Sequence, residues 1–252
     1  MAELGSDPPR SAAPGVSGVR GVGGVRGMRT REHILDVAER LFAEHGIDGP
    51  SLNEINTQAG QRNKTSLQYH FGGRGGLVEA ILARHREWFR TRGETLAADL
   101  VQTGRLDDVR SLVELQIRPL AEYVALGRSQ RYYVRIWAEV LASPDTRLEE
   151  IKDRIDQPVQ TDTARRLIAI MARAMPRELA VERLTGMLQS AVHAFADRAV
   201  LEDAVNPRRT LVPLPIVTAN LVDMISAALT APVSPETLRA INVTPDTQTC
   251  RG

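Results

Sequence analysis

The chain has 252 residues, 42% of them hydrophobic and 25% charged, and a formal net charge of +1. This composition is typical of a globular protein of one large or two modest domains. The net charge excludes a polycationic protein that binds nucleic acid through its overall charge, so any affinity for nucleic acid must come from local charge.

Cysteine usage and hydropathy limit the remaining classes. The only cysteine is Cys250, so an internal disulfide or a cysteine-based metal site is excluded. No run of about 18 apolar residues occurs, and the N-terminus lacks the apolar segment of a signal peptide. We therefore expect a cytoplasmic protein with no membrane partner.

Residues 1–29 are rich in glycine, proline, serine and alanine, which predicts a disordered arm. Between positions 10 and 31 there is no acidic residue, and the arginines are Arg10, Arg20, Arg26, Arg29 and Arg31. Such an arm can lie along phosphates or enter a minor groove. Two alternatives are a solvated tail without a role and a translation start at Met28, which would remove residues 1–27.

The first predicted helix covers residues 30–45. Its apolar residues recur at helical spacing and are Ile34, Val37, Ala38, Leu41 and Phe42. We place the charged residues, Glu39 among them, on the opposite, solvent-facing side. Gly46 follows where a left-handed cap ends a helix.

A second helix begins at Ser51, whose hydroxyl is expected to cap it, with Glu54 completing a capping box. Gly60 ends it. Asn63 is a suitable N-cap for a third, short helix, which Leu67 and Phe71 anchor on one face. Its outward polar residues are then Lys64, Thr65, Ser66, Gln68 and Tyr69.

This third helix has the shape and the donors to enter a major groove of DNA. Glutamine offers a donor and an acceptor to adenine, and hydroxyl groups can bind bases or phosphates. No acidic residue occurs between Ala59 and Leu77. From periodicity alone, however, the three helices could equally be a structural hairpin without a DNA-binding role.

The stretch 30–89 resembles the DNA-binding domain of the tetracycline-repressor (TetR) family of bacterial regulators. The resemblance rests on the Leu-Phe-Ala-Glu-His-Gly end of helix one, the Ala59-Gly60 turn, and Leu-Gln-Tyr-His-Phe at 67–71 followed by Gly73-Arg74 and a new helix. Two features depart from the family pattern: the turn between Gly60 and Leu67 is one residue longer, and Asn56 replaces a small apolar residue.

The resemblance implies a repressor that a small-molecule effector releases from double-stranded DNA. Arg74 matches a basic family position that touches phosphate. We predict these DNA-binding residues: Ser51, Asn53, Asn63, Lys64, Thr65, Ser66, Gln68, Tyr69, His70 and Arg74. Asn63 also caps the helix, and His70 has the alternative of a packing role.

A fourth helix begins near residues 73–76, with Leu77, Ile81, Trp88 and Phe89 as its buried stripe. Helical patterns continue at 112–124, at 130–141, from 146 towards 174 with a bend near Pro158, at 176–204 and at 215–231. Strand-like alternation is absent from the sequence. After Pro232 the chain becomes polar and is expected to be flexible.

The last two strong helices, 176–204 and 215–231, are apolar over wide faces. We expect them to pair with their copies in a homodimer, because a helix with a wide apolar face needs more cover than its own domain supplies. The alternative is burial within one chain. The resemblance implies the dimer as well.

The resemblance implies an effector pocket in the middle domain, without identifying its ligand. We expect its lining among Tyr123, Tyr133, Trp137, Met171, Met175 and His193, although aromatic residues and methionines also serve as plain core. The sequence contains no metal-ligand spacing, nucleotide-binding glycine loop or catalytic motif, so we predict no cofactor, no metal and no enzymatic activity.

We therefore predict an all-α protein of about nine helices. It comprises a basic arm (1–29), a three-helix helix-turn-helix DNA-binding domain (30–75), a larger helical ligand-binding and dimerisation domain (76–231) and a tail (232–252). The alternative function is a helical ligand-binding or dimerisation module that no longer binds DNA.

Overall fold

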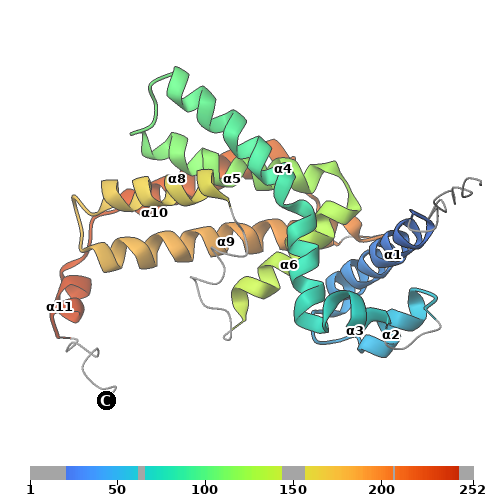
Figure 1. Cartoon of the computed structure of the whole chain (residues 1–252). Coiled ribbons are helices and arrows are strands. Elements are labelled where there is room, and N and C mark those ends of the chain that lie inside the picture. The colour runs from blue at the N-terminus through green and yellow to red at the C-terminus, as the bar shows by residue number, and fades with distance from the viewer. Residues whose placement is uncertain (1–20, 62–65, 144–156, 207, 244–252) are drawn as a thin grey trace, which may run out of the picture.

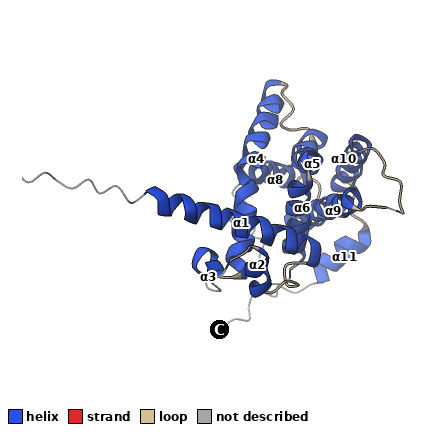
Figure 2. Ribbon diagram, turned by 90° about the vertical axis from the view of Figure 1, so that its right-hand side faces the viewer, coloured by secondary structure: helices blue, strands red, loops and turns tan. Residues whose placement is uncertain are grey.

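The computed structural model describes residues 21–61, 66–143, 157–206 and 208–243, and within these ranges it contains ten α-helices and no strand (Figure 2). The predicted all-α class is confirmed. The helices are α1 (Gly21–His45), α2 (Leu52–Gln58), α3 (Ser66–Phe71), α4 (Arg74–Gln102), α5 (Val109–Leu126), α6 (Arg128–Ala142), α8 (Pro158–Met171), α9 (Arg177–Asp203), α10 (Leu214–Thr230) and α11 (Pro235–Val243).

Helices α1, α2 and α3 form a small unit at one end of the molecule, and the start of α4 packs against it (Figure 1). The apolar stripe predicted for helix one is buried, as are Ile55 of α2, Leu67 of α3 and Leu77 of α4. Gly46 has a φ of 82°, a left-handed conformation that glycine adopts without steric cost, and so the chain can turn from α1 towards α2.

Helix α1 begins earlier than predicted, at Gly21 and not at residue 30. The prediction of disorder is therefore wrong for residues 21–29, while residues 1–20 lie outside the described part. The physical reason is that extending an existing helix by one residue costs far less than starting one. The packed segment from Ile34 to Phe42 supplies the nucleus, and the proline-free residues before it can continue the helix.

The remaining helices build a larger body around α9, which packs on α5, α6, α8 and α10 (Figure 1). Helix α5 begins at Val109, three residues before the predicted start at 112, and Asp108 caps it, since its carboxylate accepts a hydrogen bond from the Ser111 backbone N–H. Helix α4 leads from the small unit into this body. It begins at Arg74, so the predicted domain boundary at 75/76 falls inside its first turn. The helix then continues without a break past the buried Gly93 to Gln102.

Two further helix boundaries differ from prediction. Pro158 does not bend a helix but begins α8, because Gln157 before it has a non-helical backbone and proline is well suited to the first helical turn. The predicted segment 146–156 lies outside the described residues. The tail is not wholly irregular, since Pro235–Val243 form α11, and Ser234 caps it by accepting a hydrogen bond from the Thr237 N–H.

Across the described ranges, no single helix is both long and apolar enough to cross a membrane. Only α10 and α11 taken together reach that length and composition, with a bend of 63° between them.

Candidate functional site

The short helix α3 presents a polar face to solvent. Leu67 and Phe71 are buried, as predicted from their spacing, and hold the helix against the small unit. Gln68 and Tyr69 lie on the outward face, and the Tyr69 side chain is 85% exposed. Such an arrangement presents an amide and a phenol to another molecule.

The residues around this face differ in their exposure and in their contacts. Ser66 and His70 are half-buried, and the His70 ring lies edge-on to Tyr69 with ring centroids 5.2 Å apart. Gln68 donates from Nε2 to the Gly72 carbonyl at 3.1 Å. Asn63, Lys64 and Thr65 lie outside the described residues, so their predicted roles stay predictions.

Helix α2 precedes α3, and two further predicted contacts lie at its start: Ser51, its N-cap, and Asn53, both exposed. The Ser51 hydroxyl oxygen accepts from the Glu54 backbone N–H at 3.0 Å, which confirms the predicted N-cap. The second half of the capping box does not form. The Glu54 carboxylate instead accepts from the side chain of Gln58, one helical turn further on.

Arg74 is held by its own chain. Its guanidinium donates to the backbone carbonyls of Ile47 and Pro50, the latter at 2.9 Å, and lies 3.9 Å from the Asp48 carboxylate. These contacts tie the loop between α1 and α2 to the start of α4. The predicted phosphate contact stays a prediction, and the geometry also gives Arg74 a positioning role within the chain.

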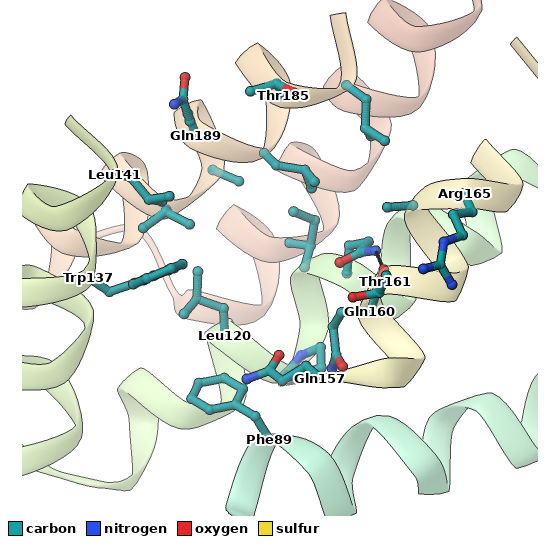
Figure 3. Close-up of a pocket in the computed structure, with 18 of the residues that line it drawn as sticks. Phe89, Leu120, Trp137, Leu141, Gln157, Gln160, Thr161, Arg165, Thr185 and Gln189 are labelled. Atoms are coloured by element: carbon teal, nitrogen blue, oxygen red, sulfur yellow. Dashed lines mark hydrogen bonds between the residues drawn. The ribbon is translucent and has the colours of Figure 1, made fainter. Parts of the chain in front are cut away.

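A cavity of about 330 Å³ lies in the larger body, between α4, α5, α6, α8 and α9 (Figure 3). Its walls are mainly apolar, with Phe89 from α4, Leu120 from α5, and Trp137 and Leu141 from α6. Glutamine side chains from α5, α8 and α9 supply most of its polar groups. Aspartate and glutamate are absent from the described residues that line it.

The predicted lining residues divide into two groups. Tyr133 and Trp137 line the cavity, as expected. Met171 and Met175 are buried but lie outside its lining, and His193 is exposed on α9, so contact of these three residues with an effector stays a prediction. His193 follows the buried Val192 in the helix and points about 100° away from it.

Tyr123 is also absent from the cavity lining and belongs to a buried polar chain. Its hydroxyl bonds to Nδ1 of His85, and Nε2 of His85 lies 2.8 Å from Oε1 of Glu39. Burial raises the pKa of the Tyr123 hydroxyl, and the Glu39 carboxylate adds to the shift, so this hydroxyl stays protonated. These hydrogen-bonded side chains connect α1, α4 and α5.

The sequence of both helical regions agrees with known families. Residues 34–81 match the family model described as "Bacterial regulatory proteins, tetR family", and residues 114–228 match that of the "Tetracyclin repressor-like, C-terminal domain". The first match covers the helix-turn-helix unit and the second covers most of the larger body. The chain belongs to the tetR family.

Individual relatives are similar over shorter stretches. AcrR of Shigella flexneri, a helix-turn-helix-type transcriptional regulator, is 42% identical over 52 residues, which cover 21% of this chain and 24% of AcrR. YttP of Bacillus subtilis is 29% identical over 84 residues, or 33% of this chain and 40% of YttP. The matches thus span less than half the length of either relative.

A solved structure agrees in fold over more of the chain. A protein of Shewanella sp. PV-4 assigned to the tetR family superposes with a TM-score of 0.51 and 17% sequence identity, over 78% of this chain and 95% of that one. At this level of identity the agreement concerns the fold alone. It confirms the predicted combination of a helix-turn-helix unit and a larger helical body.

Within this tetR-family fold, Glu39 does not lie where helical periodicity predicts it. It was assigned to the solvent-facing side of helix one, yet it is 2% exposed and bonds to His85, which is 5% exposed. Arg84 adds ion pairs of 2.8, 2.8 and 2.9 Å to Glu32, Asp36 and Glu39. One signal was available: these three acids recur at helical spacing and so share a face of α1.

A second contact joins the two parts of this tetR-family protein from α6. Oε1 of Glu139 accepts a hydrogen bond from the backbone N–H of Ile47 at 2.7 Å, just after α1 ends. The hydroxyl of Tyr132, also on α6, donates to Glu44 at 3.2 Å. Trp137 and Leu141 of the same helix line the cavity, so α6 contacts both the cavity and the helix-turn-helix unit.

The glutamines of the cavity were also missed: Gln116, Gln157, Gln160 and Gln189. Their signal in the sequence is weak, because glutamine is usually a solvated surface residue. Gln157 and Gln160 are three residues apart beside Pro158, and a helix start at that proline would have placed both on one face. No group of three or more histidine, cysteine, aspartate or glutamate side chains suited to a metal ion occurs among the residues searched, which are the described ones.

Proposed function

We propose that this protein is a sequence-specific DNA-binding transcriptional repressor that a small-molecule effector releases from its operator. The observation that carries the proposal is the outward placement of Gln68 and Tyr69 on α3, with Leu67 and Phe71 anchoring the opposite face. A helix held this way can enter a major groove, where the glutamine amide pairs with adenine and the phenol reaches a base or a phosphate.

The proposed DNA-binding surface extends from α3 to the start of α2. It combines Ser51 and Asn53 with Ser66, Gln68, Tyr69 and His70, and with the predicted contacts Asn63, Lys64, Thr65 and Arg74. The hydroxyl of Ser51 already caps α2, so in this proposal the backbone N–H groups at that helix end serve a phosphate. The name of the relative AcrR, a transcriptional regulator, supports this assignment.

We further propose that the protein acts as a homodimer through α9 and α10. Helix α10 has one charged residue, Asp223, and leaves Ile216 and Met224 each 58% exposed, while Val200 of α9 is 47% exposed. A second copy would cover these side chains. A two-fold arrangement would also bring two α3 helices to half-sites one turn of DNA apart.

The proposed mechanism is geometric. The helix-turn-helix unit (30–75) is connected to the body (76–231) through α4, through the Glu39–His85 bond and through the Glu139–Ile47 bond. A ligand that fits the cavity better when these helices are shifted would change the spacing of the two α3 helices and weaken DNA binding. Such a shift needs a differential binding free energy of only about 1–3 kcal/mol.

A DNA-binding measurement tests the proposal. Fluorescence anisotropy with a labelled duplex from the region upstream of the protein's own gene should give salt-sensitive, competitor-resistant binding. The double variant Gln68→Ala/Tyr69→Ala should lose the preference for this duplex over a scrambled one, because the removed groups read the bases. The control Gln102→Ala, an exposed glutamine at the end of α4, should keep the preference.

The alternative function gives a different result. A ligand-binding or dimerisation module without DNA binding would show no affinity of the wild-type protein for any duplex, including at low salt. Equal binding of the cognate and scrambled duplexes by the wild-type protein would likewise contradict sequence-specific reading.

A further inference from the structure

The cavity in the larger body has its largest group of polar side chains at α8, and we call this side the polar wall; Gln116 of α5 and Thr185 and Gln189 of α9 add polar groups elsewhere in the lining. Gln157, Gln160, Thr161 and Arg165 lie along α8, whereas Trp137 and Leu141 of α6 stand on the other side (Figure 3). Arg165 is at the rim, since its side chain is 71% exposed and it pairs with Asp162 at 2.7 Å. The inner part of the polar wall therefore consists of uncharged groups.

One glutamine amide in this wall lacks hydrogen-bond partners. The side-chain oxygen and nitrogen of Gln160 are both buried without a partner among the described residues. Gln157, which also lines the cavity, is 9% exposed. Leaving such groups unsatisfied is unfavourable, and native proteins rarely do so away from functional sites.

The Gln160 amide also lies against α4. A β-carbon added to Gly93 would stand 2.7 Å from Nε2 of Gln160, so the amide occupies the space that the absent side chain leaves. The terminal torsion of glutamine is soft, and a rotation can turn the amide away from Gly93 onto a molecule in the cavity. A ligand bound there would change a contact of the helix that carries the helix-turn-helix unit.

The charge of the lining limits the ligand further. A buried organic cation needs a carboxylate or another anion nearby to offset its loss of hydration. Among the described residues of the wall there is no acidic side chain. The apolar surface of Phe89, Leu120 and Trp137 favours an apolar body of the ligand.

We propose that the cavity takes an uncharged, largely apolar molecule with one carboxamide-like end. This end offers a donor and an acceptor side by side to the amides of Gln157 and Gln160, and the apolar body lies between α5, α6 and α9. The inference rests on the proposed function only in taking this cavity as the effector site.

Three probes of equal shape test the inference by isothermal titration calorimetry on the full chain without DNA. They are 4-propylbenzamide, 4-propylacetophenone, in which a methyl group replaces the NH₂, and the cation 4-propylbenzamidinium. We expect the amide to bind about tenfold more tightly than the ketone, which lacks the donor. The amidinium should bind more weakly than the ketone.

Substitutions assign the preference to the proposed groups. In the double variant Gln157→Leu/Gln160→Leu, amide and ketone should bind within about twofold of each other, as expected when a shared hydrogen bond is lost. Retained binding of the ketone shows that the cavity is intact. The control Gln189→Leu makes the same change on α9 and should keep the tenfold preference.

Several results would overturn the inference: an amidinium that binds as tightly as the amide, a double variant that keeps the preference, or a wild-type protein that binds none of the probes. None of them bears on DNA binding, which the anisotropy measurement tests separately. Conversely, a protein that binds no DNA can still show the amide preference, so the two failures are distinguishable.

Discussion

Glu39 of α1 and His85 of α4 form a buried bond of 2.8 Å between Oε1 and Nε2, which joins the helix-turn-helix unit to the helix that leads into the body. Tyr123 binds the other ring nitrogen and extends the connection to α5. The two parts of the molecule are thus connected by specific polar contacts as well as by the chain.

Replacing His85 tests this connection. His85→Leu leaves the buried Glu39 with Arg84 and Ser129 as partners but without the imidazole. We expect a loss of about 3 kcal/mol in the free energy of unfolding, near the low end for breaking a buried pair, because Arg84 still holds the carboxylate. Urea unfolding followed by circular dichroism measures it. The matched control is His33→Leu at an exposed site of α1, which should change stability by less than about 0.5 kcal/mol.

Substituting Arg74 distinguishes a role in holding the loop between α1 and α2 from a role in binding a DNA phosphate. Arg74→Ala removes the donors that bind the carbonyls of Ile47 and Pro50. The free energy of unfolding should fall by about 1.5–3 kcal/mol in the absence of DNA, and Arg74→Lys should restore only part of it, since an ammonium lacks the planar fork. Unchanged stability together with weaker DNA binding would instead assign Arg74 to a phosphate.

Gly93 is expected to affect function more than stability. Gly93→Ala places a methyl group against the Gln160 amide and should push it off α4, as we propose for the effector. Because alanine favours a helix over glycine by about 1 kcal/mol, stability should stay level or rise. Operator affinity without ligand should fall severalfold in the anisotropy assay. Gly186→Ala on α9 meets no neighbouring atom within 4 Å and should leave operator affinity unchanged.

The proposed dimer depends on the exposed apolar face of α10. Ile216→Glu/Met224→Glu places two charges where a second copy would pack, and burying them unpaired costs several kcal/mol. Light scattering after size-exclusion chromatography should show a dimer for the wild-type protein and a monomer for this variant. Val205→Glu, at an apolar residue that is 93% exposed, should remain a dimer. A monomeric wild-type protein at micromolar concentration would rule out the interface.

Local sequence patterns predicted most helices and the anchors of α3. Leu67 and Phe71 were expected to be buried because residues four apart share a face of a helix, and they are. Ser51 was expected to cap α2 because hydroxyl residues accept from the N–H groups of the first turn, and it does. Both predictions depend only on residues close together in the chain.

Glu39 shows where such reasoning fails. Local spacing put it on the polar side of α1, and a charged residue is expected to face water unless a partner is near. Its partner His85 is 46 residues away, and only the packing of α4 across α1 brings the two together. The same holds for Arg74, whose carbonyl acceptors are 24 and 27 residues distant.

The sequence by itself determined the helical class and the helix order, because helical periodicity and caps are properties of neighbouring residues. Its motifs also carry the resemblance to the tetR family, which the family models confirm. Only the tertiary structure decided which polar side chains face each other. It also decided that polar residues of α8 line the cavity and that the missing side chain of Gly93 makes room for Gln160. Those contacts depend on the relative placement of helices far apart in the chain, since a short-range pattern carries no information about distance between them.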